Sequence, residues 1–337
     1  MKAVRLHAAQ DLRLEEVEAP SAPPRGHVTL AVRAAGICGS DLHNFRTGQW
    51  ITRSPSTAGH EFCGRIIAVG RDVNGLSVGD LVAADSRFTC GVCPACRSGR
   101  GQICEALGFV GEACDGGFAE AVTLPAALLH RHDPALPPAV AAMAEPLAVA
   151  LHAVRRLRPP PGEPVLVLGC GTIGGLCALL LSRLHEGPLL LADLNAEKAA
   201  LVAEVCAGRA IELSADTVAA ALPGGRLRYA LDATGSVAAI ETALSLLAGG
   251  GALALVGISH GRLSLDPNHL VEREIALLGC HAFGDELPEA IALLPELAPA
   301  LLRFVTVLPG LDAVPDAYER LLRGEGHGLK TIIHVAD

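Results

Sequence analysis

The sequence predicts an α/β protein in which a largely β-stranded N-terminal domain precedes a doubly wound parallel-sheet domain. Its 337 residues correspond to two domains, at roughly 100 to 200 residues per domain. Before the Pro-rich segment 158–162, β-branched runs are separated by Gly and Pro turns, as in β domains. After that segment, apolar strand-like runs alternate with Ala- and Leu-rich helical segments, which predicts βαβ units.

The composition indicates a folded chain whose binding partner is a small molecule. Hydrophobic residues make up 50% and aromatic residues only 3%, so the core must be built from Ala, Val, Leu and Ile. Such a chain is not disordered. The 27 Lys and Arg against 36 Asp and Glu give a formal charge of −9, which argues against a nucleic-acid or anionic-membrane binder.

Neither a membrane span nor a secretory signal is expected. The longest apolar stretches, such as Leu176–Leu181 and Ala252–Val256, are far shorter than the roughly 20 residues that cross a bilayer. The N-terminal residues contain no apolar signal segment, so we expect a cytoplasmic protein. The 11 cysteines are then expected to be reduced thiols that bind metal or are buried.

The first domain is expected to span residues 1–147, and the chain from 284 to 337 returns to similar mixed character. Strands are predicted at Val28–Val32 and Gly64–Val69, with a turn at Gly79-Asp80. The C-terminal segment ends in a strand-like run, Thr331–Val335.

Residues 148–283 are expected to form the parallel-sheet domain, with helices on both faces of the sheet. The predicted strands are Val165–Leu168, Leu189–Ala192, Ala230–Asp232, Ala252–Val256 and Ile275–Leu278. The predicted helices are Ile173–Leu184, Ala196–Cys206 and Ala238–Leu247.

Four cysteines at short intervals form the first group with metal-binding chemistry, Cys90, Cys93, Cys96 and Cys104. Four thiolates in a Gly- and Pro-containing loop suit a tetrahedral zinc ion. Because sulfur would fill every coordination position, such a metal stabilises a loop and does no chemistry. The alternative is a set of unligated or redox-active cysteines.

A second group combines a thiol, an imidazole and carboxylates. Cys38 lies in the motif GICGSDLH, and His60-Glu61 lie in the motif GHE. A catalytic zinc needs about three protein ligands and one open position. Glu145, in the apolar segment 141–150, also needs a partner or a metal. Spacing alone leaves open separate roles: Cys38 as a small core residue, His60 as a surface histidine and Glu145 as a helix-start carboxylate.

The third group is a glycine-rich turn between a predicted strand and a predicted helix, comprising Gly169, Gly171, Thr172, Ile173 and Gly174. Its glycines allow the backbone to approach a pyrophosphate at a helix N-terminus. Asp193 ends the next apolar run, where an acid accepts hydrogen bonds from an adenosine ribose. No Arg follows in Leu194-Asn195-Ala196-Glu197, which favours NAD over NADP.

These motifs, in this order, resemble the zinc-containing medium-chain alcohol dehydrogenase family over essentially the whole chain. The sequence is similar to the sorbitol, threonine and butanediol dehydrogenase branch, where Glu-Pro replaces a cysteine ligand, as Glu145-Pro146 does here. The resemblance implies a GroES-like catalytic domain formed by the N-terminal part and the C-terminal tail, with a Rossmann domain inserted between them. It also implies homodimers or homotetramers that form through sheet edges of the nucleotide domains.

The resemblance further assigns a role to each site residue. The implied ligands of a catalytic zinc are Cys38, His60 and Glu61, with Glu145 as a direct or water-mediated fourth. Ser40 would take the substrate proton and His43 would relay it to solvent. The implied reaction oxidises a secondary alcohol, a polyol or a related hydroxylated metabolite, to a ketone and transfers hydride to NAD.

One departure from the sequence pattern of sorbitol dehydrogenases narrows the expected class of substrate. Sorbitol dehydrogenases similar to this chain carry an Arg beside an aromatic residue near the strand after the last nucleotide-domain helix. The corresponding stretch here, 279–284, has no Arg, which argues against a hexitol substrate. Arg46 or His281 are the candidates to replace it, and threonine- or butanediol-type substrates remain as alternatives.

Three other classes of protein fit the motifs less well. A zinc-free, NADPH-dependent quinone or enone reductase would lack both metal-binding groups. A non-catalytic NAD-binding protein would not need the ligands and the proton relay together. A zinc-finger nucleic-acid module would need a basic helix beside the four-cysteine loop, and the acidic balance of the chain disfavours it.

Overall fold

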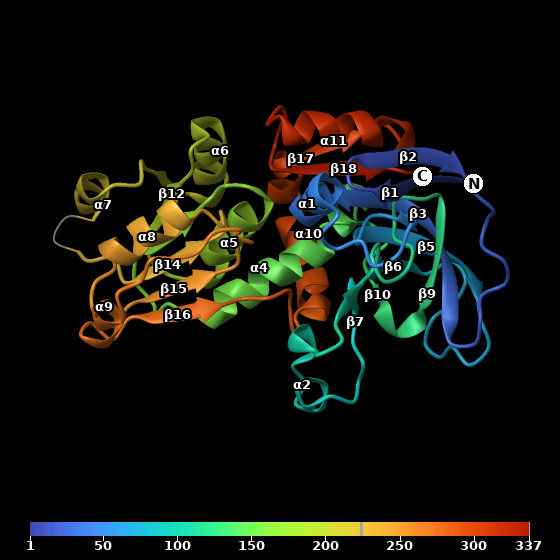
Figure 1. Ribbon diagram of the computed structural model, residues 1–337, viewed down its shortest axis with the longest axis horizontal. Helices are drawn as coiled ribbons and strands as arrows, with labels where there is room; N and C mark the ends of the chain where they lie inside the picture. Colours follow the sequence, from blue (N-terminus) through green and yellow to red (C-terminus); the bar gives the residue numbers. More distant parts are fainter. Residues whose placement is uncertain (223–224, 337) are drawn as a thin grey trace. The chain divides into compact units, whose positions relative to one another are not determined.

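The computed structural model describes residues 1–222 and 225–336 and divides the chain into two compact units. The first unit combines residues 1–145 with the C-terminal segment from Leu287, and the second spans Pro146–Glu286. The sequence had suggested these junctions at 147/148 and 283/284. The blue-to-green and red parts of the ribbon in Figure 1 therefore belong to one unit.

The first unit is built on a mostly antiparallel sheet whose central strand is β3 (His27–Ile37). β3 pairs with β5 (Glu61–Val69) on one side and with β18 (Lys330–His334) on the other. The predicted strands Val28–Val32, Gly64–Val69 and Thr331–Val335 are thus confirmed. The register pairs Gly36 with Glu61 and Ile37 with Thr331, so the end of β3 lies beside both neighbouring strands.

The remaining elements of the first unit are short strands and helices. Its other strands are β6 (Leu81–Ala84), β7 (Arg87–Phe88), β8 (Gly108–Phe109), β9 (Ala121–Pro125), β10 (Leu129–Arg131) and β17 (Val305–Leu308). Its helices are α1 (Gly39–Thr47), α2 (Pro94–Arg97), α3 (Pro138–Ala141), α10 (Leu287–Phe304) and α11 (Val314–Leu322), with single 3-10 turns at Gly101–Ile103, Ala126–Leu128 and Leu311–Ala313. Helix α4 (Ala144–Leu157) crosses from this unit into the second.

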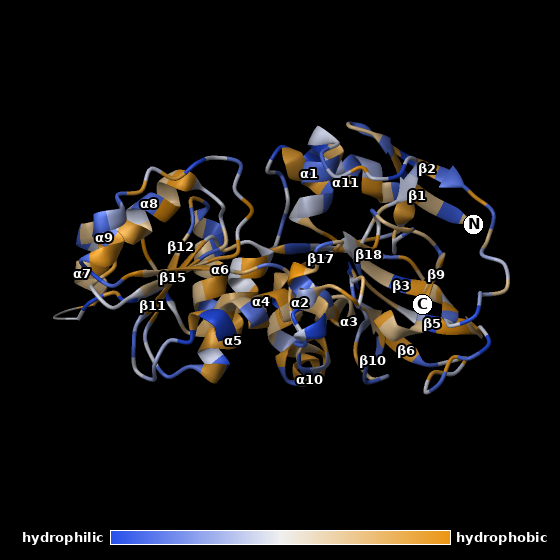
Figure 2. Cartoon of the chain, turned by 60° about the horizontal axis from the view of Figure 1, so that its bottom comes forward, coloured by the Kyte–Doolittle hydropathy of each residue, from blue (hydrophilic) through white to orange (hydrophobic). Residues whose placement is uncertain are grey.

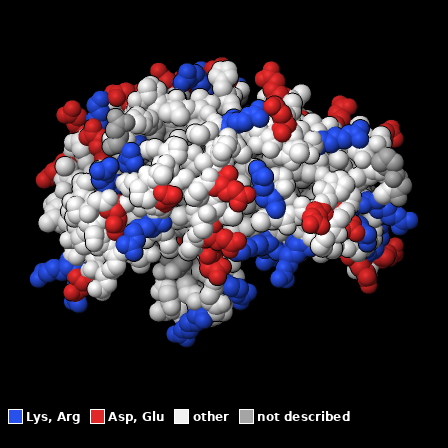
Figure 3. Space-filling view, turned by 180° about the vertical axis from the view of Figure 1, so that it is seen from behind, with Lys and Arg blue, Asp and Glu red and all other residues white. Residues whose placement is uncertain are grey.

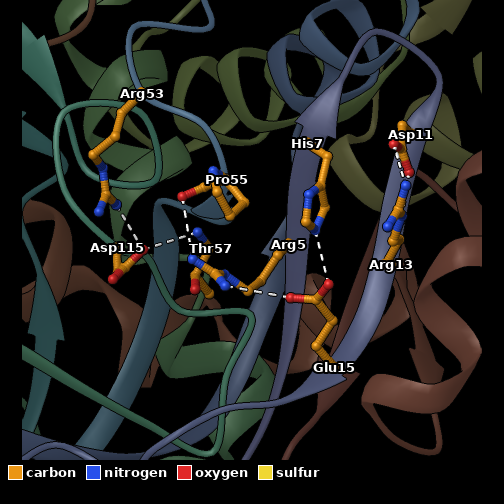
Figure 4. Close-up of polar contacts among 9 residues, drawn as sticks. All are labelled: Arg5, His7, Asp11, Arg13, Glu15, Arg53, Pro55, Thr57 and Asp115. Carbon is orange, nitrogen blue, oxygen red and sulfur yellow. Dashed lines mark hydrogen bonds and ion pairs between the residues drawn. The ribbon is translucent and has the colours of Figure 1, made fainter.

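A small second sheet has the strand order β2-β1-β4, formed by β1 (Lys2–Ala8), β2 (Asp11–Glu16) and β4 (Ser56–Thr57). Figure 4 shows the polar contacts on it. Glu15 of β2 accepts hydrogen bonds from two side chains of β1, Arg5 at 3.3 Å and His7 at 2.8 Å. These contacts join β2 to β1 through side chains as well as through the backbone ladder.

The core of the first unit contains few aromatic residues, in keeping with the composition, but they stand close together. Tyr318 of α11 is buried and makes edge-to-face contacts with Phe45 (centroids 5.5 Å apart) and Phe118 (6.4 Å). The other buried side chains of this core come from several strands, with the largest share from β3, and Figure 2 shows that β3 and β5 are largely hydrophobic. This packing fixes α1 and α11 close to the end of β3.

The longest helix, α10, was missed by the sequence pattern, which gave residues 284–337 only a mixed character. It contains Pro295 and Pro299, residues that normally end a helix. The helix nevertheless continues, because a row of apolar side chains is buried along it, namely Leu287, Ile291, Leu294, Leu297 and Leu301. Burial of this face outweighs the loss of two backbone donors.

The second unit is a parallel six-stranded sheet with the order β13-β12-β11-β14-β15-β16. Its strands are β11 (Val165–Leu168), β12 (Leu189–Ala192), β13 (Arg209–Ala210), β14 (Tyr229–Asp232), β15 (Ala252–Leu255) and β16 (Ala276–Gly279). Its helices are α5 (Thr172–Leu184), α6 (Ala196–Cys206), α7 (Ala215–Ala221), α8 (Val237–Leu246) and α9 (Pro267–Val271). The doubly wound arrangement confirms the predicted fold class.

Both faces of this sheet are covered. Leu166 and Leu168 of β11 pack in one cluster with residues of α7 and α8. Val165 and Val167, which point to the opposite face, are equally buried. A parallel sheet needs this double cover, and it explains why its strands are continuously apolar.

The surface is mixed in charge. On the face that Figure 3 shows, acidic and basic side chains are interspersed over most of the surface. Among residues 1–222 and 225–336, no helix is long and apolar enough to cross a membrane.

Candidate active site

The ends of two neighbouring strands bring a thiol, an imidazole and a carboxylate together. Cys38 follows β3 and caps the N-terminus of α1, while His60 and Glu61 stand at the start of β5. One ligand atom from each residue lies within 4.8 Å of the others. The donor set of sulfur, nitrogen and oxygen fits a zinc site with three protein ligands. We refer to Cys38, His60 and Glu61 as the metal group.

Asp41 orients this group, a role that the sequence reading did not assign. Its Oδ2 accepts a 2.8 Å hydrogen bond from the backbone N–H of Cys38, and its Oδ1 lies 3.4 Å from Nδ1 of His60. Burial alone would lower the pKa of His60, but Asp41 and Cys38 raise it well above its usual value. Because Asp41 engages Nδ1, Nε2 of His60 is directed to the metal group. The signal in the sequence was an acid three residues after an N-cap.

Ser40 and His43 both lie on α1. Ser40 Oγ is 3.5 Å from Nε2 of His60, so the hydroxyl borders the metal group. His43 is buried, and its Nε2 lies 2.9 Å from Oε1 of Gln49. Its ring also packs against Trp50, with centroids 4.6 Å apart. One short helix therefore carries both predicted relay residues.

Glu145 lies outside the metal group. The sequence predicts it as a direct or water-mediated ligand. In the structure its Oε1 accepts a 2.7 Å hydrogen bond from Ser86 Oγ, and the residues whose ligand atoms converge are Cys38, His60 and Glu61. Burial raises the pKa of Glu145 to about 7, and repulsion from nearby Glu61 contributes to the rise. Of the two carboxylates, Glu61 is the one with an oxygen within 4.8 Å of the ligand atoms of Cys38 and His60, and the ligand role of Glu145 stays a prediction.

A buried lysine, also missed by the sequence reading, stands beside Glu61. Lys330 of β18 forms an ion pair with Glu61 and donates a 2.9 Å hydrogen bond to the carbonyl of Ile37. Burial alone would lower the pKa of Lys330, but Glu61 and Cys38 raise it, so the ammonium stays charged. Nothing in the sequence near Lys330 indicated this contact, because 269 residues (330 − 61) separate the partners.

Glu112 is a further carboxylate near the metal group. Its loop packs against the chain before His60, since a Cβ at Gly111 would lie 3.0 Å from the backbone nitrogen of Gly59. Thr52 Oγ1 donates a 3.0 Å hydrogen bond to the carbonyl of Glu112. The side chain is half-buried, and burial raises its pKa to about 7 against the attraction of His60.

The four predicted loop cysteines, Cys90, Cys93, Cys96 and Cys104, converge with their sulfur atoms within 4.8 Å of one another. Backbone N–H groups point at these sulfurs: that of Cys93 lies 3.4 Å from Cys90 Sγ, and that of Cys90 lies 3.3 Å from Cys104 Sγ. The backbone N–H groups of Cys96 and Glu105 likewise point at Cys93 Sγ and lower the pKa of Cys93 to about 6. Four converging sulfurs with amide donors fit a closed structural zinc site.

The glycine-rich turn lies where predicted, between β11 and α5. Gly169 has φ +86°, and a Cβ at Gly174 would overlap the carbonyl of Gly169, so both positions require glycine. Gly171 caps α5, and a Cβ there would meet no atom within 4 Å. The open space at this helix N-terminus fits the pyrophosphate of a dinucleotide.

Asp193 follows β12 and faces the same turn. Its Oδ2 accepts a 2.6 Å hydrogen bond from the backbone N–H of Cys170, and its Oδ1 accepts one of 2.7 Å from that of Asn195. The carboxylate is therefore held beside the glycine-rich turn. Thr172 and Ile173 form the first turn of α5, beyond Gly171.

Known families match both units in this order. Residues 24–134 match the alcohol dehydrogenase GroES-like domain, and residues 175–296 match the zinc-binding dehydrogenase family. Sorbitol dehydrogenase of Bacillus subtilis strain 168 is 28% identical over 343 residues, covering 99% of this chain and 97% of that protein. L-Galactonate-5-dehydrogenase of Escherichia coli K12 is 33% identical over 261 residues, 76% of each chain. L-Threonine 3-dehydrogenase of Edwardsiella ictaluri strain 93-146 is 28% identical over 345 residues, 99% of each chain.

Solved structures agree with this match. An alcohol dehydrogenase of Escherichia coli CFT073, crystallised with NADH, superposes with a TM-score of 0.90 at 27% identity over 99% of both chains. A zinc-binding dehydrogenase of Sinorhizobium meliloti 1021, bound to NADP, gives a TM-score of 0.89 at 28% identity over 99% of this chain and 98% of that one. The fold, the metal group and the four-cysteine loop are those of a zinc-binding, dinucleotide-linked oxidoreductase. The chain belongs to the zinc-containing medium-chain alcohol dehydrogenase family.

Proposed function

We propose that the protein oxidises a secondary alcohol, a small polyol or a related hydroxylated metabolite, to a ketone with NAD as the hydride acceptor. The observation that carries the proposal is the metal group, whose ligand atoms lie within 4.8 Å of one another while Ser40 Oγ lies 3.5 Å from His60. Bound zinc would polarise the hydroxyl oxygen of the substrate, and bound NAD would accept the hydride.

The side chains of this unit divide the remaining work. Cys38, His60 and Glu61 hold the metal, and Asp41 fixes the ring of His60 through Nδ1. The substrate hydroxyl loses its proton to Ser40 Oγ, which donates its own proton onward. His43 passes this proton to solvent. The substrate carbon loses a hydride at the same time, so alcohol and NAD⁺ give ketone, NADH and one proton.

NAD, not NADP, is the proposed cofactor. The carboxylate of Asp193 is fixed beside the glycine-rich turn, where it can accept hydrogen bonds from ribose hydroxyls and would repel a 2′-phosphate. The residues directly after it, 194–197, provide no arginine to bind such a phosphate. The solved relatives include one with NADH and one with NADP, so the choice rests on these residues of the chain itself.

The substrate is proposed only as a class. The relatives named above carry names for sorbitol, galactonate and threonine dehydrogenases, which share a secondary alcohol beside further polar groups. A threonine- or butanediol-type substrate is the alternative within this class.

The experiment is an assay of NAD and NADP reduction with sorbitol, other polyols, threonine and 2,3-butanediol, together with zinc analysis of the purified protein. We expect about two zinc ions per chain and faster reduction of NAD than of NADP.

Ser40→Ala should keep its zinc and lose about 10²- to 10⁴-fold in kcat. Cys38→Ser should lose one zinc and the activity, whereas Ser98→Ala, an exposed serine in the cysteine loop, serves as the control. Zinc-replete protein that reduces neither cofactor with any of these alcohols would refute the proposal.

A further inference from the structure

Lys330 is a buried lysine that the proposed reaction does not use. It begins β18, and only 1% of its side chain is exposed. Lysine is almost never fully buried unless its charge is paired, because transfer of an ammonium out of water is costly. The groups around it therefore indicate what its charge does.

Two partners fix the ammonium. It forms an ion pair with Oε2 of Glu61, and it donates a 2.9 Å hydrogen bond to the carbonyl of Ile37. Ile37 directly precedes Cys38. The ammonium thus links the start of β5, where Glu61 lies, to the end of β3, which Cys38 follows.

The space for this pair depends on Gly36. The sheet register places Gly36 opposite Glu61. A Cβ at position 36 would overlap Oε2 of Glu61 and lie 2.7 Å from Cε of Lys330. The missing side chain leaves the room that the carboxylate and the ammonium fill.

Stability alone is a weak reason for such a pair. Buried ion pairs can often be exchanged for apolar groups at no loss of stability. Here, however, one partner is Glu61, a member of the metal group. Its carboxylate is 2% exposed and needs a compensating charge whenever no metal supplies one.

We propose that Lys330 is a positioning residue of the metal group: its ammonium holds Glu61 beside Cys38 and His60 before zinc binds, and it weakens the hold of the loaded site on zinc. This inference rests on the proposed function, because it takes the metal group as the zinc site. In the metal-free protein, the ammonium of Lys330 neutralises the buried carboxylate of Glu61 and so stabilises that form. The loaded protein keeps the same ammonium close to a dication that repels it. Removal of the ammonium therefore destabilises the metal-free form more than the loaded form, and by linkage zinc is bound more tightly.

The test compares full-length wild type with Lys330→Met and Lys330→Gln, and uses Lys2→Met, at a half-exposed surface lysine, as the control. Zinc release to a chelating dye is followed in time, and melting temperatures are measured for zinc-loaded and zinc-depleted protein. The release phase that Cys38→Ser lacks is assigned to the metal group. The other phase, from the four-cysteine loop, is an internal reference in every sample.

In Lys330→Met we expect the Cys38-dependent phase to slow roughly tenfold, a size typical of residues that contact a metal ligand. The zinc-depleted variant should melt several degrees lower than wild type, and zinc should raise its melting temperature by more than it raises that of wild type. Lys330→Gln should change both quantities in the same direction. Lys2→Met and the reference phase should not change.

A double variant separates charge from packing. Glu61→Gln should restore the melting temperature of zinc-depleted Lys330→Met, because a neutral amide needs no counter-charge. If Lys330→Met does not fold, its rescue by Glu61→Gln provides the same test, and failure of that rescue overturns the inference.

Two further results would overturn it: equal zinc release from wild type and Lys330→Met, or an equal fall in melting temperature with and without zinc, which would assign Lys330 to packing alone. Absence of any Cys38-dependent release from wild type would instead refute the proposed function.

Discussion

The carboxylates near the metal group differ in what balances their charge. Glu61 is paired with Lys330, and Asp41 lies 3.4 Å from His60. Glu112 is half-buried, and burial raises its pKa to about 7. Because this pKa lies above the usual value of 4.5, the folded state holds the Glu112 proton more tightly than the unfolded state does.

We therefore predict that Glu112 makes the protein less stable as pH rises through about 7. Its contribution is fully favourable below pH 4.5 and is lost as the folded carboxyl ionises. Glu112→Gln cannot ionise, so relative to wild type it should gain on the order of 1 kcal/mol in unfolding free energy between pH 5 and pH 8. Melting temperatures at a series of pH values check this.

The control for that series is Glu105→Gln, at an exposed glutamate of the cysteine loop. It should follow the wild-type curve. A Glu112→Gln curve parallel to that of wild type from pH 5 to pH 8 would show that Glu112 does not titrate in this range.

At the scale of single residues, sequence reasoning found the groups whose chemistry is unusual and missed those whose role depends on contact. Cys38 and His60 were singled out because thiol and imidazole are typical metal ligands, and the ligand role of Glu61 came from the family resemblance. Lys330 and Glu112 carry common side chains in unremarkable contexts. Only the register of β18 on β3, and the packing of Gly111 on Gly59, bring them to the site.

At the scale of elements, β4 is joined to the loop 109–116 by one carboxylate. Asp115 Oδ1 accepts a 2.9 Å hydrogen bond from the backbone N–H of Thr57 and one of 2.6 Å from Arg53 (Figure 4). Burial alone would raise the pKa of Asp115, but these two donors lower it below 3.8. The carboxylate is thus more acidic in the folded protein than in the unfolded chain.

We predict that Asp115→Asn lowers stability at pH 7 and that the difference disappears in acid. A lowered folded pKa contributes stability above the unfolded pKa of 3.8, and this contribution is lost as pH falls through the folded value. The side chains of Asp115 and Arg53 are about half exposed. The expected loss of unfolding free energy at pH 7 is therefore only about 0.5–1 kcal/mol. Urea unfolding at pH 7 and pH 3 measures it.

Arg53→Met and the double variant complete a thermodynamic cycle for this contact. The coupling between positions 53 and 115 should be smaller at pH 3 than at pH 7. A coupling of equal size at both pH values would contradict an ionic origin.

Elements with a regular apolar period were predicted well, and elements shaped by burial were not. Strands β11 and β12 and helix α6 have the predicted bounds, because βαβ units repeat a simple pattern of apolar and polar residues. In α10, two prolines obscured the helical period. Strands β1 and β4 pair across a long stretch of sequence, Arg5 with Thr57 for example, so their pairing follows from tertiary contacts that the local sequence does not encode.

At the scale of the whole molecule, the two units divide the chemistry that the motifs contain. The metal group and the four-cysteine loop belong to the first unit, and the glycine-rich turn and Asp193 to the second. The chain length and the change of pattern near residue 158 predicted this division. In the structure each unit buries a core of its own. The return of the chain to the first unit was expected only from the family resemblance, because no local signal predicts which strands a C-terminal segment joins.

The free edge of the second sheet leads to a prediction about assembly. β16 ends the strand order of that sheet and pairs only with β15 within the described part of the chain. The amides of Ala276 and Cys280 donate to carbonyls on the β15 side, so the amide of Gly279 between them points outward. Nearby Val271 is 73% exposed. We propose that two copies of the chain associate through this edge, since an unpaired strand edge is a template for another strand.

Gly279→Pro tests this association without a change in the interior of the sheet. Proline removes only the outward donor and is tolerated on edge strands, and a Cβ at this position meets no atom within 4 Å. Gly279→Ala adds the same Cβ but keeps the N–H, so it is the matched control. Light scattering during gel filtration should find dimers or tetramers for wild type and Gly279→Ala, and a smaller species for Gly279→Pro with an unchanged circular dichroism spectrum. If Gly279→Pro keeps the wild-type mass, the copies associate through another surface, because a pair of four-residue edge strands has few backbone hydrogen bonds and cannot spare an outward donor.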